Sequence, residues 1–305
     1  MMADILNTFL QLIPITLAQS LIYAFVALGI MLPFRILSFP DLTSEGAFPL
    51  GGCVCGTLLS LGVHPLVAML AAAVAGFAAG CSTALIHLRF RINTLLAGIL
   101  MITMLFSVNL RIMGRSNIPL FSFPNIFDAL WSGMNSAVWM KIVFLAMLVG
   151  AIVAGLAAFF KTEIGTGVRA VGANVEMAEA QGIDVWKATI AGVGAAGALS
   201  ALGGSLLVQS QGYADVNIGF GVLINGLAAL IIGEQVIGNR TVLRQVMAPV
   251  LGAIIYYQLV SFCLALGLPP SDLKLATGLF VLFMLGLPAL RGQTGGMLKR
   301  EKVRE

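Results

Sequence analysis

The sequence predicts an all-α, multi-pass membrane protein. Of its 305 residues, 59% are apolar and only 10% are charged, whereas soluble globular chains carry roughly 25% charged residues. Mean hydropathy is +1.00. A helix needs about 20 residues to cross a hydrocarbon core about 30 Å thick, and apolar runs of that length recur with short polar breaks. We therefore expect one transmembrane domain over 1–305 and no separate soluble domain.

Nine apolar spans follow one another, with a range of eight to ten because some are short or broken. The first lacks the basic region and the cleavage site of a signal peptide, so we expect it to be retained. The second and the seventh are short and Gly-rich, which favours broken or re-entrant helices. The predicted spans are 11–32, 47–63, 65–88, 94–112, 138–160, 188–209, 217–235, 244–267 and 273–290.

Basic residues gather on one side of these spans. Because successive spans alternate in direction, thirteen of the 17 Lys and Arg residues fall on the side of segment 161–187, and four fall on the other. The positive-inside rule then places 161–187 and the tail 291–305 in the cytoplasm and the amino terminus outside.

Some functional classes are disfavoured by the residues themselves. The basic residues stand singly, without the interleaved aromatic side chains of a nucleic-acid surface, so no nucleic-acid partner is expected. The four cysteines lie in apolar runs without nearby His clusters, so we expect no metal site. The phosphate-binding pattern GxxxxGK[ST] does not occur, so this chain is not expected to hydrolyse ATP.

Segment 161–187 is a long polar interruption that opens with "KTEIGTGVRAVGANVEMAEAQGI". Apolar and small residues recur there at helical spacing, which predicts a short helix over 168–181, interrupted at Gly172 and stopped at Gly182. A short helix with small residues on one side suits docking into another protein. The alternative is a solvated connector.

The stretch "RAVGANVEMAEAQGIDVWKATIAGVGAAGALSALGGSLL" resembles the cytoplasmic loop and following helix of permease subunits of bacterial ATP-binding-cassette importers. The resemblance is to the group serving branched-chain amino acids, ribose and related solutes, and within it to a poorly characterised subgroup with presumed tryptophan or tyrosine importers. The family pattern is Arg-Ala-x-Gly/Ala, then Asn-x-x-x-Ala, then Gly-Ile/Val-Asn/Asp. It is matched by Arg169, Ala170, Gly172, Asn174, Ala178, Gly182, Ile183 and Asp184.

The resemblance implies a mechanism with several partners. Two permease copies form the pathway in a bacterial inner membrane, two cytoplasmic ATPase subunits use ATP and Mg²⁺, and a binding protein delivers solute from outside. The permease itself carries no cofactor, and segment 161–187 is the coupling helix. The residues expected to contact the ATPase are Arg169, Ala170, Gly172, Asn174, Glu176, Ala178, Glu179 and Gly182.

The entry to the second span, "FPDLTSEGAFPLGG", is similar to the Asp-Leu-Ser-x-Gly segment of sugar-type members, with one extra residue, Glu45. Its two carboxylates, Asp41 and Glu45, have two interpretations. Either Asp41, Thr43 or Ser44 caps the span, with a nearby carboxylate favouring the positive helix end. Or a discontinuous helix faces the pathway and forms an inner gate.

Asn109, Arg111 and Asn225 are further candidates for the pathway. Arg111, at the outer end of the fourth span, either attracts a solute carboxylate or a binding protein, or snorkels to the membrane interface. Asn225, midway along the seventh span, either bonds a neighbouring helix or faces solute. Glu234 in the same span is expected to pair with Arg240.

The segments "PDLTSEGAFPLGG" and "YADVNIGFGVLING" each pair an acidic residue with a short Gly-rich helix, after spans of opposite direction. This arrangement suits an inverted repeat around a central binding region. Two other functional classes compete with an importer permease. An ion-coupled transporter needs buried mid-span charges, which are scarce here, and a membrane-embedded enzyme needs paired acids, metal ligands or an activated nucleophile, which the sequence does not display.

Overall fold

The protein is a bundle of helices. The computed structural model describes residues 2–130 and 137–267, together with 269, 272, 273, 275, 277–279, 282 and 283. The helices are α1 (Met2–Met31), η1 (Leu32–Ile36), α2 (Ser44–Ser60), α3 (Pro65–Phe90), α4 (Thr94–Met113), α5 (Ile126–Leu130), α6 (Ala137–Phe159), α7 (Glu163–Ala173), α8 (Val175–Ala180), α9 (Val185–Gln211), η2 (Val216–Gly219), α10 (Val222–Ile237) and α11 (Val242–Ala265). Two short strands, β1 (Asn117–Pro119) and β2 (Tyr213–Asp215), form one antiparallel pair with Ile118 opposite Ala214.

Seven helical segments within the described residues are long and apolar enough to cross a membrane. They are Ile5–Ile36, Pro65–Phe90, Thr94–Met113, Val138–Phe159, Val185–Gln211, Val216–Ile237 and Val242–Ala265. The predicted count of nine is not confirmed. The predicted second span corresponds to α2, which has only 17 residues and extends for roughly 26 Å. Most of the predicted ninth span, 273–290, and the whole predicted tail, 291–305, lie outside the described residues. The all-α, multi-pass architecture is confirmed.

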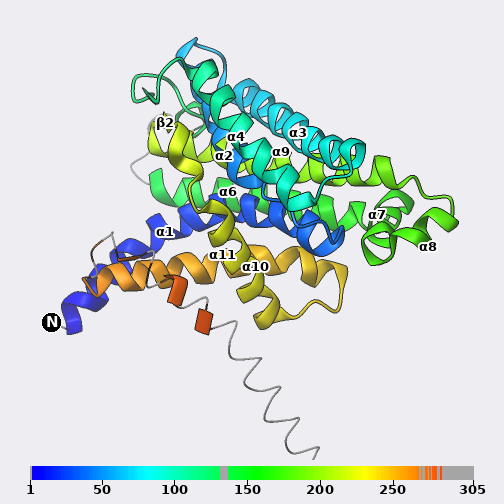
Figure 1. Ribbon diagram of the computed structural model, residues 1–305. Helices are drawn as coiled ribbons and strands as arrows, with labels where there is room; N and C mark the ends of the chain where they lie inside the picture. Colours follow the sequence, from blue (N-terminus) through cyan, green and yellow to red (C-terminus); the bar gives the residue numbers. More distant parts are fainter. Residues whose placement is uncertain are drawn as a thin grey trace, which may run out of the picture.

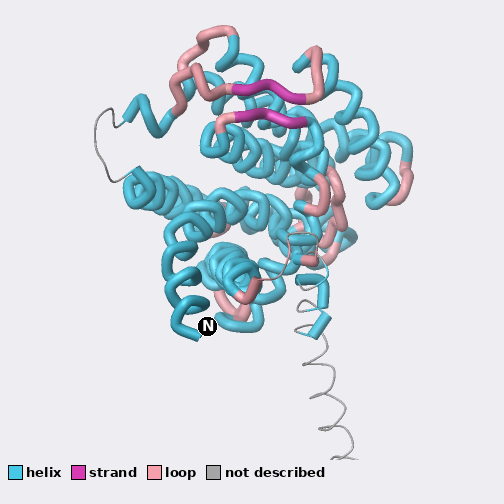
Figure 2. The backbone as a smooth tube through the Cα atoms, turned by 90° about the vertical axis from the view of Figure 1, so that its left-hand side faces the viewer, coloured by secondary structure: helices cyan, strands magenta, loops and turns pink. Residues whose placement is uncertain are grey.

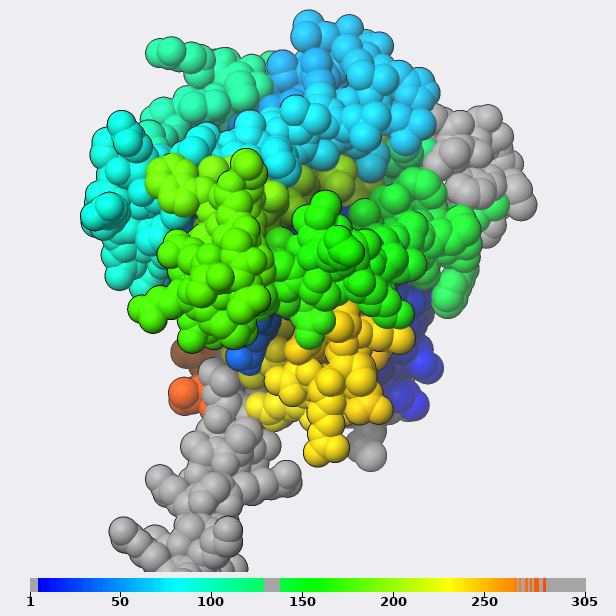
Figure 3. All heavy atoms as spheres, turned by 90° about the vertical axis from the view of Figure 1, so that its right-hand side faces the viewer, coloured from blue at the N-terminus to red at the C-terminus, as the bar shows by residue number. Residues whose placement is uncertain are grey.

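The helices extend between two ends of the molecule (Figure 1). α7 and α8 lie together at one end, which we call the α7 end, and β2 lies towards the other, which we call the strand end. Figure 2 shows the two paired strands side by side at the strand end. Figure 3 looks at the α7 end, where the green α7 and α8 lie next to the yellow turn between α10 and α11.

α9 is the central helix and packs against α1, α2 and α3. Small residues bring the helices close, because van der Waals packing rather than hydrophobicity draws helices together in lipid. A Cβ atom at Gly197 of α9 would lie 2.2 Å from the Gly76 carbonyl oxygen of α3. A Cβ atom at Gly252 of α11 would lie 1.7 Å from the Ala229 carbonyl oxygen of α10. These two helix crossings therefore require glycine.

Two long helices are followed by breaks inside the bundle. α1 continues into the π-helical turn η1, which contains Pro33, and α2 begins only at Ser44. α9 ends at Gly212, whose φ is +76°, and α10 begins after Gly221, whose φ is +81°. Both glycines adopt the left-handed backbone that other residues reach only with strain, so each allows the chain to change direction.

The two breaks meet. Glu45 Oε1 accepts a hydrogen bond of 3.0 Å from the Gly221 N–H, and Gly219 lies against Pro49. From this point α2 runs to the strand end and α10 runs to the α7 end, each for roughly 24 to 26 Å. The second span is short, as predicted, but its helix α2 is continuous over Ser44–Ser60. The seventh span is broken between η2 and α10 at Phe220 and Gly221, and the inverted repeat stays a prediction.

Gly197→Ala should destabilise the fold, because the added methyl group meets the Gly76 carbonyl oxygen. Overpacking of this kind costs about 1 to 3 kcal/mol, so we expect a lower midpoint of thermal unfolding, followed by circular dichroism in detergent. Gly150→Ala on α6 is the matched control, since nothing lies within 4 Å of its Cβ position and alanine favours a helix by about 1 kcal/mol over glycine. Equal midpoints for the two variants would contradict the close crossing.

Candidate functional site

The segment between α6 and α9 forms two short helices at the α7 end. Thr162 caps α7, because its Oγ1 accepts a backbone N–H of the first turn at 3.2 Å. Asn174 caps α8 in the same way through its Oδ1, at 3.0 Å. The predicted interruption at Gly172 is therefore wrong: the helix breaks at Asn174, which is extended, and Gly172 lies inside α7. The predicted stop at Gly182 is confirmed, with φ of +80°.

The small residues of this segment face the interior of the protein. At Gly172 a Cβ atom would lie 1.8 Å from the Ile36 carbonyl oxygen, so α7 packs directly on η1. Ala178 is fully buried and Ala170 is half-buried. We expected these three residues to admit a partner protein. In the structure Gly172 and Ala178 instead hold α7 and α8 against their own chain.

The outer surface of the segment carries the remaining residues expected to contact a partner. These exposed residues are Arg169, Asn174, Glu176, Glu179 and Gly182. Val175 and Met177 stand among them, each 48% exposed. We define the α8 surface as Arg169, Val175, Glu176, Met177 and Glu179. Exposed apolar side chains surrounded by charges of both signs are typical of protein interfaces.

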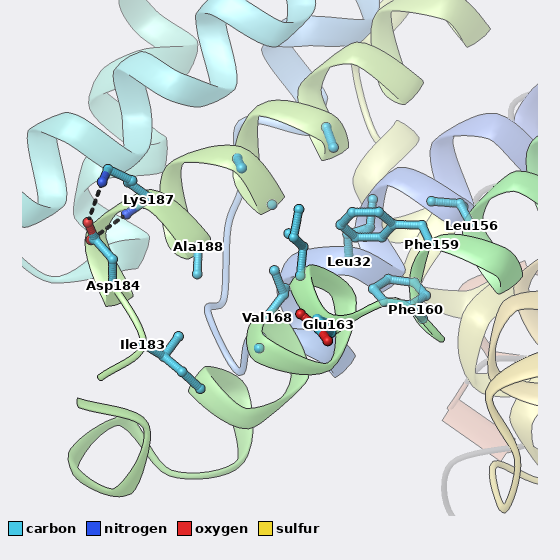
Figure 4. A pocket seen from close by; sticks show the side chains of 15 residues that line it. Leu32, Leu156, Phe159, Phe160, Glu163, Val168, Ile183, Asp184, Lys187 and Ala188 are labelled. Atoms are coloured by element: carbon cyan, nitrogen blue, oxygen red, sulfur yellow. Dashed lines mark hydrogen bonds and ion pairs between the residues drawn. The ribbon is translucent and has the colours of Figure 1, made fainter. Parts of the chain in front are cut away.

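An apolar cavity of about 600 Å³ lies between α6, α7 and α9 (Figure 4). Its walls include Phe159, Phe160 and Val168. Asp184 and Lys187 stand at its side, joined by an ion pair of 3.0 Å and by a hydrogen bond of 3.1 Å from the Lys187 backbone N–H. That backbone hydrogen bond is the main reason why the pKa of Asp184 lies below its ordinary value. The pair fixes the first turn of α9 beside the cavity.

A second group of polar residues lies where the two helix breaks meet. Glu45, Asn109 and Phe220 line a cavity of about 60 Å³. Phe220 also lines a neighbouring cavity of about 350 Å³, together with Asn225 and Tyr256. The structure thus brings together three candidate residues, Glu45, Asn109 and Asn225, from three different helices.

Asn225 makes the predicted contact between helices. The Tyr256 hydroxyl of α11 donates a hydrogen bond of 2.9 Å to Asn225 Oδ1 of α10. The next residue, Tyr257, stacks on Tyr23 of α1 with ring centroids 4.7 Å apart. Asn225 therefore belongs to a polar and aromatic contact that joins three helices, and it also faces the larger cavity.

Asp41 belongs to a buried turn before α2. Its Oδ1 accepts hydrogen bonds from the Thr43 N–H at 2.9 Å and from the Thr43 hydroxyl at 2.5 Å. The Thr43 hydroxyl also lies 2.8 Å from that of Thr83 on α3. Asp41 therefore stabilises the turn that leads into α2, whose N-cap residue Thr43 makes no side-chain capping hydrogen bond, whereas Glu45 is the carboxylate that lines a cavity.

Arg111 and Glu234 lie apart from this central group. Arg111 is exposed in the last turn of α4 and lines neither of the two central cavities. Glu234 forms an ion pair with Arg35, so the expected pairing with Arg240 is wrong. The reason is that η1 lies beside the end of α10, while Arg240 follows the left-handed turn at Gly238.

Sequence reasoning missed the aromatic side chains of the central group. Phe220 is 70% exposed and Phe106 is 44% exposed, and both line the cavity of Glu45. Phe220 stands between two glycines in "IGFG", inside the break before α10. A lone aromatic residue between helix-breaking glycines is the sequence signal by which Phe220 could have been found.

Helices that begin inside a bundle, with polar side chains at the break, are typical of proteins that move solutes across membranes. The fold and the site thus define a multi-pass membrane transport protein. A family model described as the permease component of branched-chain amino acid transport systems matches residues 12–287. The chain belongs to this permease family, which confirms the resemblance predicted from its sequence.

Relatives support the same assignment. The chain is 38% identical to the tyrosine transport system permease protein of Clostridioides difficile over 88% of each chain. It is 34% identical to an uncharacterized protein of Rickettsia prowazekii, over 88% of this chain and 94% of that protein. It is 27% identical to the ribose import permease protein RbsC of Escherichia coli, over 78% of this chain and 73% of RbsC. No solved structure gives a significant match.

The contact between Asn225 and Tyr256 should be measurable in a double-mutant cycle. Asn225→Leu and Tyr256→Phe each remove one partner of the same hydrogen bond, so their effects on the free energy of unfolding should be non-additive by about 0.5 to 1.5 kcal/mol. Denaturant unfolding in detergent gives the four free energies. Tyr256→Phe combined with Asn117→Ala on β1 is the control cycle and should be additive. Additivity in both cycles would rule out the contact.

Proposed function

We propose that this chain is the membrane-spanning subunit of an ATP-driven importer and forms the path of an amino acid across a bacterial inner membrane. The observation that carries the proposal is the meeting of two helix breaks, where Glu45, Asn109 and Asn225 line adjoining cavities. Membership of the permease family supports the transport role. Polar groups placed inside a membrane protein are costly and are typically functional.

The α8 surface is proposed to dock into a cytoplasmic ATPase, which binds ATP and Mg²⁺ in place of this chain. Its exposed Val175 and Met177 supply apolar contact, and its charged residues supply polar contact at the rim. The turns at the α7 end carry Arg35, Arg91 and Arg240, which by the positive-inside rule supports a cytoplasmic location for this end. The amino terminus is then outside.

The solute is proposed to arrive from an external binding protein and to pass between two copies of this chain. Phe106 and Phe220, both exposed, stand beside the central cavities, so the cavities are open at one face of a single copy. A second copy against this face would enclose the path. An aromatic amino acid fits the aromatic lining, and the name of the C. difficile relative specifies tyrosine transport for that protein.

A second candidate function is ion-coupled transport. It is favoured by one observation, the Glu45 carboxylate between membrane-crossing helices, because buried acids carry protons or cations in such transporters. The two functions differ in their energy source, which makes them separable in one assay.

Purified protein reconstituted in liposomes with its ATPase and binding protein should take up L-tyrosine only when ATP is supplied. Radiolabelled uptake measures this directly, and liposomes without the ATPase are the control. Uptake driven by a sodium or proton gradient in the absence of the ATPase would instead establish the ion-coupled alternative.

Glu176→Lys and Met177→Ala should weaken binding of the ATPase, because both residues belong to the exposed α8 surface. The minority of interface residues that dominate binding each cost more than about 1 kcal/mol when truncated, and for residues of that kind we expect about a fivefold or greater fall in co-purified ATPase and in uptake. The unfolding midpoint of the permease alone should not change. Asp128→Lys, an equal charge reversal on α5, is the control. Unchanged co-purification in both α8 variants would remove this surface from the interface.

A further inference from the structure

Glu45 is a carboxylate without a positive partner. Its Oε1 accepts the Gly221 N–H at 3.0 Å and so caps α10, but among the described residues it forms no ion pair. An ionised carboxylate accepts several hydrogen bonds at its two oxygens, so this cap leaves accepting capacity unused. Because an uncompensated charge between membrane helices is unfavourable, a capping role alone does not account for an acid at this position.

The cavity beside Glu45 offers acceptors and no positive charge. Its lining contains one other strongly polar side chain, Asn109, which is 1% exposed. Asn109 Oδ1 is buried and accepts no hydrogen bond from the described residues, so a polar group capable of bonding is left unpaired. The described lining of both central cavities contains no Lys, Arg or His. Such a lining favours a cation that donates hydrogen bonds.

Two aromatic rings complete this environment. Phe106 of α4 and Phe220, at the break before α10, line the same cavity. Aromatic rings attract cations through their negative faces, and they bury apolar parts of an amphipathic solute. The same features disfavour solutes whose only charge is negative, since the Glu45 carboxylate repels an unpaired carboxylate or phosphate, and a neutral sugar offers no positive charge to pair with Glu45.

We propose that Glu45 is the residue that binds the protonated amino group of the transported solute, with the Asn109 amide as a second acceptor and Phe106 and Phe220 as aromatic walls. This inference rests on the proposed function. It names the chemical class of the solute that binds where the two helix breaks meet: a primary ammonium compound. The cavity of about 60 Å³ accommodates the ammonium group itself. The rest of the solute extends into the neighbouring cavity of about 350 Å³, which shares Phe220.

The charge of Glu45 can be removed without removing its cap. Glu45→Gln keeps a side-chain oxygen that accepts the Gly221 N–H, whereas Asn109→Leu removes the second acceptor at similar volume. Asp128→Asn on α5 is the matched control, since it also replaces an acid by its amide and its partner is Asn125 at the strand end. Unfolding midpoints of all variants establish that each is folded.

Binding should be measured on the purified permease in lipid nanodiscs, without the binding protein, by saturation-transfer NMR. The probes are L-tyrosine, tyramine, which keeps the amino group, and 3-(4-hydroxyphenyl)propionate, which lacks it. We expect L-tyrosine and tyramine to bind and the propionate not to bind. Glu45→Gln should weaken tyramine binding about tenfold or more, as loss of a charged hydrogen bond does. Asn109→Leu should weaken it less, and Asp128→Asn should leave it unchanged.

The inference is overturned if the propionate binds as well as tyramine, if neither amine binds, or if folded Glu45→Gln binds tyramine as the unmodified protein does. It is also overturned if binding requires sodium and Glu45→Gln abolishes that requirement, because Glu45 then serves a metal cation. These results are independent of the liposome assay. Absence of ATP-driven uptake overturns the importer proposal, while the NMR data still decide whether Glu45 recognises an amine.

Discussion

The structure depends on one constraint: each backbone group freed by a helix break inside the membrane must find a partner within the protein. At the first break the Leu37 and Phe39 N–H groups bond back to carbonyl oxygens of η1, at 3.1 and 2.8 Å. Asp41 then accepts the Thr43 N–H. At the second break Glu45 accepts the Gly221 N–H. The backbone N–H groups of the first break thus bond within that break. The Gly221 N–H of the second break bonds to a side chain of the first, Glu45, and this bond holds the two breaks together.

Close packing around α9 makes the placement of these breaks possible. A Cβ atom at Gly204 of α9 would lie 1.9 Å from the Phe48 carbonyl oxygen of α2, so the first turns of α2 rest on the central helix itself. α2 is short and largely buried, and it brings Glu45 beside η2 because α3 and α4 cover its other sides. The small residues that read as a featureless apolar stretch are thus what positions the carboxylate.

The sequence predicts local features well where composition alone determines them. Long apolar runs identified most helices, and Gly182 was recognised as a stop because its left-handed backbone is a local property. The contacts of Glu234 and of Gly172 were misjudged for one shared reason. Both residues meet η1, which lies 136 positions from Gly172 at Ile36 and 199 positions from Glu234 at Arg35, and no periodicity encodes such a contact. The cavity of Glu45 likewise combines residues of α2, α4 and the segment before α10, which only tertiary packing brings together.

A continuous series of contacts joins the α8 surface to the central break. α7 packs through Gly172 on the Ile36 carbonyl group of η1, and the adjacent Arg35 pairs with Glu234 near the end of α10. The other end of α10 is Gly221, which is bonded to Glu45. Because a helix transmits displacement along its axis as a stiff element, movement of α7 by a docked ATPase would act on α10 and on the cavity that it borders. Under the proposed function, ATP-driven motion at the membrane surface therefore has a direct route to the solute through η1 and α10.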